Sequence, residues 1–243
     1  MTAAFDTLAA RYDEIWTESP VGRAQRRQVW RELDPLFPAG ARILDMGCGT
    51  GADAAHFLAR GVAVMAFDAS PAMVRAALGR GVTATVLRVE EMETLRGSYD
   101  GALSNFGALN CVSDLSGVAV DLGRLIRPGG TVALCTLGRF CAWESLYYVV
   151  RGQFRKAARR WRGSAASSLG IDVRYPGVAE LAAAFAPEFE LRRWKGIGLA
   201  VPPSYVRLPE LAIRMLDAVD AVLAGLPLLR GWADHRLLLL VRK

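Results

Sequence analysis

The sequence predicts an α/β fold, with a mostly parallel sheet that carries helices on both faces. An apolar stretch over residues 41–46 runs directly into a glycine-rich turn, and a second apolar stretch, 62–67, ends on the acid Asp68. Short apolar stretches of this kind are typical of buried strands. Strand-like and helix-like segments then alternate as far as residue 137, and this alternation favours parallel strands joined by crossover helices.

The elements of this core follow in order from hydrophobic periodicity and turn residues. The strands are expected at 41–46, 62–67, 82–88, 99–105, 130–137, 188–194 and 235–242, and the helices at 52–60, 71–79, 114–126 and 177–186. Pro128-Gly129-Gly130 is a turn signal ahead of the fifth strand. Seven strands in this arrangement predict a doubly wound sheet.

The segments outside this alternation are expected to be a helical N-terminal region and two insertions, within one domain that spans 1–243. The N-terminal region is 1–38, with short helices at 5–17 and 20–33, and the insertions are 139–171 and 196–233. Asp6 and Ser19 are suitable helix N-caps, and Pro20 suits a first helical turn. The second insertion contains an amphipathic helix that runs from Glu210 to Ala224.

Composition limits the class of protein. Of the 243 residues, 52% are hydrophobic, which supports a large core and excludes a disordered chain. No apolar run approaches the length of a membrane span, and the first residues lack the basic and apolar regions of a secretory signal. The four cysteines show no Cys-x-x-Cys spacing and there are only two histidines. We therefore expect reduced thiols, no metal site and a cytoplasmic protein.

The net charge of +6 is concentrated in residues 151–162, which we call the basic segment. It contains six Arg and Lys residues and no acid, so the rest of the chain balances to zero. Three interpretations are open: a solvated helix face, a surface that engages anionic lipid headgroups, and a site for RNA or a phosphorylated substrate. Phe154 and Trp161, interleaved with the arginines, suit the second. RNA is the weakest, because no RNA-binding module accompanies this one short stretch.

The glycine turn indicates which kind of ligand binds. Its pattern is Gly-x-Gly-x-Gly at 47, 49 and 51, which differs from the Gly-x-Gly-x-x-Gly of dinucleotide enzymes. Asp45 precedes the turn, and an acid there would repel a phosphate but favour an ammonium or a sulfonium. Asp68, at the end of the second strand, is placed to accept ribose hydroxyls. We therefore expect a nucleoside with a cationic tail.

With these residues in view, the chain resembles the class I S-adenosylmethionine (SAM)-dependent methyltransferases over most of residues 5–138. The resemblance rests on Ile43–Gly51, on Phe67–Val74 and on Arg127–Thr131. The opening stretch, Phe5–Asp13, is similar to the start of ubiquinone/menaquinone-type methyltransferases. The resemblance implies a Rossmann-like sheet with an antiparallel last strand, SAM as cofactor, and an N-terminal region that folds over the cofactor as a lid.

The resemblance also implies roles for individual residues. The glycine turn, with Asp45, Gly47, Cys48, Gly49 and Gly51, would line the methionine part of SAM, and Asp68 would accept both ribose hydroxyls. The residues expected near ribose and adenine are Ala69, Ser70, Met73 and Met92. Glu90 and Glu91 are candidates to hold the adenine amino group, and Glu91 is favoured by its offset to Tyr99-Asp100. Tyr12 would contact the tail of the cofactor.

Methyl transfer from a sulfonium is an in-line displacement, so the protein must orient the acceptor and exclude water. The acceptor is expected beyond the carboxyl ends of strands four and five, where Asn105 and Phe106 would face the methyl group. A general base is needed only for an alcohol or a phenol, and Tyr12 and His235 are the candidates. His235 follows Asp234, although adjacent residues on a strand point to opposite faces. His56, within a helix, is better explained by packing.

We expect methyl transfer to a small, fairly apolar organic acceptor, which would be a secondary metabolite, a quinone-like ring or a lipid. The apolar insertion and the aromatic N-terminal region favour this choice, with oxygen ahead of carbon as the accepting atom. One alternative is a methyltransferase of an anionic lipid or RNA that uses the basic segment, in which case neutralising Arg155, Arg159 and Arg160 would abolish turnover. The other is a non-catalytic SAM-binding partner protein, which would leave no open acceptor pocket beside Asn105.

Overall fold

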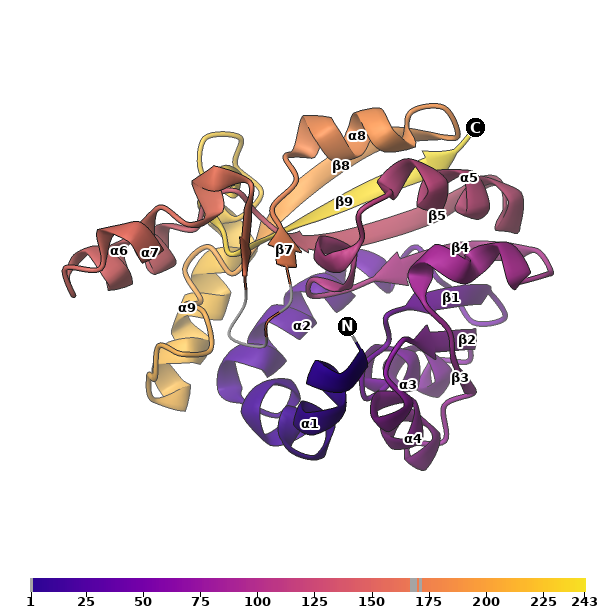
Figure 1. The fold of residues 1–243 in the computed structure, drawn as a ribbon, viewed down its shortest axis with the longest axis horizontal. Coiled ribbons are helices and arrows are strands. Elements are labelled where there is room, and N and C mark those ends of the chain that lie inside the picture. The colour runs from indigo at the N-terminus through magenta and orange to yellow at the C-terminus, as the bar shows by residue number, and fades with distance from the viewer. Residues whose placement is uncertain (1, 167–169, 171) are drawn as a thin grey trace.

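The computed structural model describes residues 2–166, 170 and 172–243, and it contains a seven-stranded sheet (Figure 1). The strands are β1 (Arg42–Met46), β2 (Ala63–Asp68), β3 (Ala84–Val86), β4 (Tyr99–Ser104), β5 (Ile126–Leu137), β8 (Phe189–Ile197) and β9 (His235–Arg242), in the order β3-β2-β1-β4-β5-β9-β8. β9 is antiparallel to both β5 and β8, whereas the pairings among β1 to β5 are parallel. The Rossmann-like, doubly wound sheet with an antiparallel last strand is confirmed.

Helices cover both faces of this sheet (Figure 1). They are α1 (Thr2–Tyr12), α2 (Pro20–Leu33), α3 (Ala52–Ala59), α4 (Pro71–Gly79), α5 (Leu115–Leu125), α6 (Ala142–Val149), α7 (Phe154–Ala157), α8 (Val178–Phe185) and α9 (Glu210–Leu223). No helix in these residues is long and apolar enough to cross a membrane.

The hydrophobic core has one large cluster on each face of the sheet and a third, smaller cluster between α2 and α9. Ile43 belongs to the cluster that includes Val29 of α2 and Phe57 of α3. Its neighbour Leu44 belongs to the cluster that includes Leu122 of α5 and Phe185 of α8. Successive residues of a strand point to opposite faces, so β1 must be apolar at every position to serve both clusters. This double burial explains the continuous apolar runs in the sequence.

The N-terminal region and the first insertion differ in detail from the sequence-based expectations. The first helix begins at Thr2 and passes into a π-helical turn, Asp13–Thr17, while α2 coincides with the expected 20–33. The insertion 139–171 contains α6, α7 and β6 (Ser164–Ala166), which pairs with β7 (Asp172–Arg174) outside the main sheet. The basic segment is not one helix, because α7 ends at Ala157 and a 3-10 turn follows.

Candidate active site

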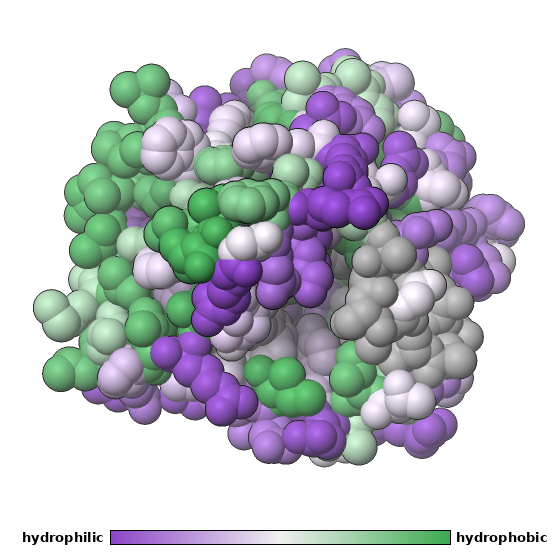
Figure 2. All heavy atoms as spheres, turned by 60° about the vertical axis from the view of Figure 1, so that its left-hand side comes forward, coloured by the Kyte–Doolittle hydropathy of each residue, from purple (hydrophilic) through white to green (hydrophobic). Residues whose placement is uncertain are grey.

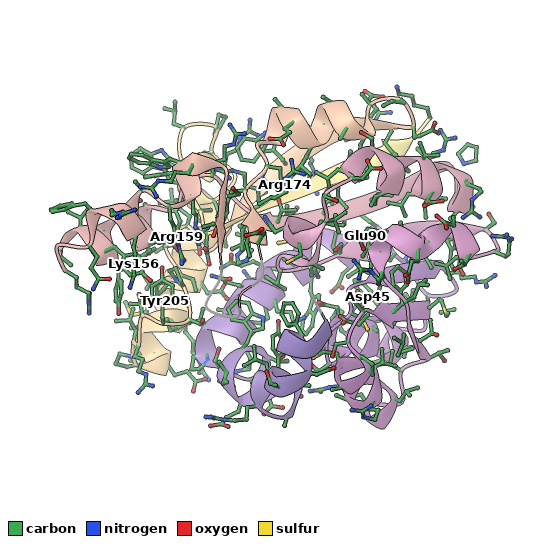
Figure 3. All side chains as sticks on the ribbon, viewed as in Figure 1. Asp45, Glu90, Lys156, Arg159, Arg174 and Tyr205 are labelled. Atoms are coloured by element: carbon green, nitrogen blue, oxygen red, sulfur yellow. The ribbon has the colours of Figure 1, made fainter. Side chains whose placement is uncertain are left out.

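A cavity of about 220 Å³ lies at the carboxyl ends of the parallel strands, and Phe5 and Tyr12 of α1 form part of its lining. Its lining residues are Phe5, Tyr12, Gly47, Gly49, Asp68, Ala69, Ser70, Met73, Val89, Glu90, Asn105, Phe106, Gly107, Ala108, Cys111, Val112, Leu137 and Val173. Figure 3 shows the labelled Asp45 and Glu90 on the side of the parallel strands, well apart from Lys156 and Tyr205. Ligands of open α/β sheets bind at this edge.

The glycine turn shapes the floor of the cavity. Gly47 and Gly51 have φ values of 68° and 79°, in the left-handed region that favours glycine. A Cβ on Gly47 would lie 2.4 Å from the Cβ of Ala108, so glycine allows the turn to approach the segment after β4. A Cβ on Gly51 would lie 2.8 Å from the Cβ of Ala77. Gly51 therefore lets α3 pack against α4, and it does not line the cavity.

Asp68 joins the end of β2 to the glycine turn. Its Oδ2 accepts a hydrogen bond from the Gly49 N–H at 2.9 Å, and its Oδ1 accepts one from the Ser70 N–H at 2.8 Å. Burial raises the pKa of Asp68, although both backbone hydrogen bonds oppose that effect. Each carboxylate oxygen has two lone pairs, so Asp68 retains acceptor capacity for two ribose hydroxyls.

A buried acid, Asp45, and a buried arginine, Arg26, lie near the turn, close enough for the charge of each to affect the pKa of the other. Asp45 is 1% exposed and its Oδ2 has no hydrogen-bond partner among the described residues. Arg26, from α2, forms an ion pair with Asp53, and its Nε has no partner either within the described chain. Arg26 lines a small pocket of about 30 Å³ together with Cys48 and Tyr12. Burial, with the nearby negative charge of Asp53, raises the pKa of Asp45 well above its usual range.

This pair of unsatisfied groups fits the amino-acid end of SAM. Asp45 offers a carboxylate oxygen to an ammonium, and Arg26 offers a guanidinium N–H to a carboxylate. Sequence reasoning singled out Asp45, which lines neither pocket, and did not consider Arg26, because Arg26 lies outside any glycine-turn motif. The only signal would have been its position on the buried face of α2, where a charged residue needs a partner.

The 3-10 turn Val89–Thr94 brings Val89 and Glu90 to the cavity. Glu91 is turned away, since its carboxylate accepts a hydrogen bond from the Arg88 N–H at 3.2 Å and caps the 3-10 turn Val89–Thr94. Met92 is fully buried in the core beneath that turn and does not line the cavity. Adjacent residues of a short turn point in different directions, so spacing along the chain could not decide between Glu90 and Glu91.

Two acids attach the N-terminal helical region to the core. Asp6 accepts hydrogen bonds from the Ser70 hydroxyl and from the Ala72 N–H, at the start of α4. Asp13 accepts one from the Thr50 hydroxyl at 2.6 Å and pairs with Arg80. These contacts hold Phe5 and Tyr12 against the cavity.

Tyr12 lines the cavity with a buried phenol. Burial raises its pKa to about 12, so the phenol remains protonated at neutral pH. A protonated phenol cannot act as a general base, whereas it can donate a hydrogen bond to a bound ligand.

Asn105 and Phe106 follow β4 at the cavity wall. Asn105 is buried, and neither Nδ2 nor Oδ1 has a partner among the described residues. Phe106 has a positive φ of 54° and makes edge contacts with Trp16 and His235, at centroid distances of 5.5 and 5.3 Å. An unpaired buried amide is costly, so Asn105 is suited to meet a polar ligand group.

His235 begins β9, opposite Leu137 at the carboxyl end of β5. Its Nδ1 lies 3.5 Å from Oδ2 of Asp234, so these adjacent side chains approach one another because Asp234 precedes the strand. Burial lowers the pKa of His235, although the Asp234 charge opposes this effect, and the imidazole is therefore neutral at neutral pH. His235 reaches the cavity wall through Phe106 and does not itself line the cavity.

Two further polar residues have packing roles. His56 stacks on Trp30 with ring centroids 3.9 Å apart, and its Nε2 lies 2.7 Å from Asp34. Asn110 accepts from the Leu137 N–H and donates to the Arg174 carbonyl, which ties β7 to the end of β5.

Comparison with known proteins agrees with this geometry. A family model described as "Methyltransferase domain" matches residues 21–186. A demethylmenaquinone methyltransferase of Clavibacter sepedonicus is 33% identical over 144 residues, which cover 56% of this chain and 57% of the relative. A ubiquinone biosynthesis O-methyltransferase of Xanthomonas oryzae pv. oryzae is 34% identical over 110 residues, which cover 42% of this chain and 45% of the relative.

The chain thus spans about half the length of these curated relatives. Among solved structures, an S-adenosylmethionine-dependent methyltransferase from Mesorhizobium loti has the same fold, with a TM-score of 0.61 and 18% identity. That match covers 88% of this chain and 97% of the other. The family model and the relatives show that the chain belongs to the methyltransferase domain family, the class I methyltransferases, whose cofactor is S-adenosylmethionine.

Proposed function

We propose that the protein transfers the methyl group of SAM to an oxygen atom of a small, fairly apolar acceptor that carries a quinone-like ring. One observation carries this proposal: the cavity wall beyond Asn105 is apolar, and the neutral His235 lies behind it, against the ring of Phe106. Phe106, Ala108, Val112, Leu137 and Val173 supply that wall. Two relatives named for menaquinone and ubiquinone methylation support a quinone-like acceptor.

The two insertions differ in whether they contribute residues to the cavity wall. Val173 of β7 lines the cavity, whereas no described residue of 196–233 does. The apolar character of that second insertion therefore does not support an apolar acceptor, although sequence reasoning used it in that way. The aromatic residues Phe5 and Tyr12 of the lid remain as support.

In this proposal some residues around the cavity bind the cofactor, and others orient the acceptor for methyl transfer. Asp68 holds the ribose, Asp45 and Arg26 hold the amino-acid end, and Glu90 lies nearest the adenine. SAM supplies the methyl group on a sulfonium, so the protein's own task is to align the acceptor and to exclude water. Asn105 donates a hydrogen bond to the acceptor oxygen.

His235 would remove the hydroxyl proton as the oxygen attacks, which requires the ring of Phe106 to turn aside, because His235 does not itself line the cavity. A neutral imidazole is the form required of a base, and a positioned base contributes about a hundredfold or more to such a step. Carbon acceptors activated by their own ring hydroxyl would place the same demand on His235.

The alternatives from the sequence fare differently. An anionic lipid or RNA substrate held by the basic segment loses two of its charges, because Arg159 and Arg160 are engaged by Glu144. A non-catalytic SAM-binding protein would lack space beside Asn105, but the cavity includes Asn105.

The test is a product assay with SAM that carries a deuterated methyl group. The acceptors are a short-tailed catechol, a short-tailed naphthoquinol and an apolar amine, each analysed by mass spectrometry and fragmentation. A labelled methyl ether on the catechol or naphthoquinol is the expected product. A ring-carbon product would move the accepting atom to carbon. Product from the amine alone, or SAM binding without any product, would overturn the proposal.

A further inference from the structure

Helix α9 buries two of its acids against the protein and exposes a stripe of apolar side chains to solvent. Asp217 and Asp220 are only 5% and 1% exposed, and Gln28 of α2 donates to both at 3.0 Å. Leu211, Met215 and Val222 lie on the outer side and are 71%, 66% and 71% exposed. This is the reverse of a usual surface helix, in which the apolar stripe is buried.

The exposed stripe belongs to a larger apolar surface on the same side of the molecule. We define the apolar face as the exposed hydrophobic residues Leu146, Val149, Val150, Phe154, Trp161, Leu211, Met215, Val219, Val222, Leu226, Leu228 and Trp232. Figure 2 turns this side toward the reader and shows hydrophobic side chains gathered over a broad region at the left, with hydrophilic ones beside it. Large exposed apolar patches with a polar rim mark interaction sites.

The two parts of the apolar face are joined through aromatic contacts. Tyr205, ahead of α9, packs against Tyr147 and Tyr148 of α6 with centroid distances of 5.0 and 6.1 Å. α6, α7 and α9 accordingly lie together at the left of Figure 1. Figure 3 places the labelled Lys156 and Tyr205 on this side as well.

The charge around the apolar face is mainly positive, and the exposed acid Glu210 at the start of α9 is already paired with Arg23 and Arg214. The segments 145–171 and 221–233 contain no Asp or Glu. Arg159 donates two hydrogen bonds to Glu144, at 2.8 and 2.7 Å, so its charge is balanced within the protein. Arg155 and Arg162, by contrast, have no ion-pair partner in the part of the chain that the structure describes, and both are exposed. The rim thus keeps cations without counter-charges.

We propose that the apolar face docks on the surface of a bilayer that contains anionic phospholipid. Apolar side chains would enter the boundary between headgroups and acyl chains, while Arg155, Lys156 and Arg162 would contact phosphates. Trp161 and Phe154 lie among these cations, as expected of an interfacial segment. A second copy of this chain is a poorer occupant, because it would place the same unbalanced cations against one another. This inference does not depend on the acceptor.

The test is co-sedimentation of the full chain with vesicles, without any acceptor. One set of vesicles is phosphatidylcholine alone, and the other is an equal mixture of phosphatidylcholine and phosphatidylglycerol. We expect binding to the mixture only, weakened by added salt. Replacing Arg155 and Arg162 by Gln should weaken binding about fivefold for each charge removed. Arg192→Gln, a surface change on β8, is the matched control and should leave binding unchanged.

A second variant tests the apolar part. Leu211→Ser, Met215→Ser and Val222→Ser together should weaken vesicle binding about tenfold or more. Leu78→Ser with Val120→Ser, which alters exposed apolar residues elsewhere, is the control. Unchanged melting and SAM affinity would show that these variants fold.

Three results would overturn the docking proposal. One is failure to bind either kind of vesicle, and another is equal binding by the α9 variant and its control. The third is a dimer by light scattering that the α9 variant dissociates, since the apolar face would then join two copies. None of these results bears on methyl transfer, which the product assay tests separately.

Discussion

The guanidinium of Arg160 lies 2.6 Å from Oδ1 of Asp234, although the two residues are 74 positions apart. The same guanidinium donates to Glu144 at 3.1 and 2.9 Å, and Arg159 also donates to both oxygens of that carboxylate. This buried network attaches the first insertion to the residue that precedes His235. Arg159 and Arg160 belong to the basic segment, for which a solvated helix face was one interpretation. They instead form ion pairs that position the residues next to the site.

Glu144→Gln should strongly destabilise the protein. Removing one partner of a buried ion pair costs about 3–5 kcal/mol, because the remaining charges lose their compensation. Burial raises the pKa of Glu144, but hydrogen bonds and charge from Arg159 and Arg160 outweigh it and lower the pKa overall. A lowered carboxyl pKa stabilises the fold above the ordinary pKa, and that stability is lost as pH falls through the lowered value.

Thermal melts between neutral and acid pH measure this effect. Wild type should lose stability toward acid pH more steeply than Glu144→Gln. Glu180→Gln, which breaks an exposed pair with Arg139, is the control and should change stability by less than about 1 kcal/mol. A Glu144→Gln melt that matched wild type at neutral pH would contradict the network's role.

Asp68→Ala should weaken SAM binding about a hundredfold or more, because two hydrogen bonds to a charged group are lost. Titration calorimetry measures the affinity directly. Asp100→Ala is the control, since Asp100 accepts a hydrogen bond from the Arg42 N–H at the amino end of β1, away from the cavity. Near-normal affinity in Asp68→Ala would remove the ribose assignment.

SAM affinity should depend on pH through Asp45. The free protein holds the pKa of this carboxyl well above its usual range, chiefly through burial, and an ammonium binds only the ionised form. Affinity should therefore rise with pH until Asp45 is ionised without ligand, and binding should release a proton below that point. Calorimetry in buffers of different ionisation heat detects the proton. Asp45→Asn should bind more weakly and without this dependence, and a pH-independent wild type would disprove the role.

Arg26 should distinguish SAM from its decarboxylated analogue. Arg26→Gln alone would leave Asp53 unpaired, so the informative variant is Arg26→Gln with Asp53→Asn. Wild type should prefer SAM to the analogue by about tenfold or more, since a charged hydrogen bond is at stake. The double variant should bind both equally. Persistence of the preference would place the carboxylate elsewhere.

His235→Gln should lower kcat about a hundredfold or more without changing the affinity for SAM. The lowered pKa keeps the wild-type imidazole neutral at neutral pH, so activity should fall only in acid, below the usual histidine range. The pH profile of the His235→Gln variant should lack this fall in activity at acid pH. His56→Gln, at the stacked packing site, should retain both the wild-type kcat and the fall in activity at acid pH. Equal rates for His235→Gln and wild type would exclude His235 as the base.

Much of the fold followed from local patterns in the sequence. The core strands of this sheet are apolar on both faces, and the glycine turn and Asp68 occur within one strand–helix–strand unit. Contacts inside such a unit are short in sequence, so spacing alone predicted that the turn and Asp68 would meet. The antiparallel β9 followed from the family resemblance and is confirmed.

Only the tertiary structure decided how distant segments meet. Arg26, Glu90 in place of Glu91, the Arg160–Asp234 contact and the outward apolar stripe of α9 all depend on packing between elements far apart in the chain. Spacing specifies which residues share a helix face, but the identity of the neighbouring element decides whether that face is buried. In α9 the acids Asp217 and Asp220 are buried because side chains of α2 pair with them. The partners are Gln28, Arg27 and Arg31. Paired carboxylates can be buried at less cost than unpaired ones.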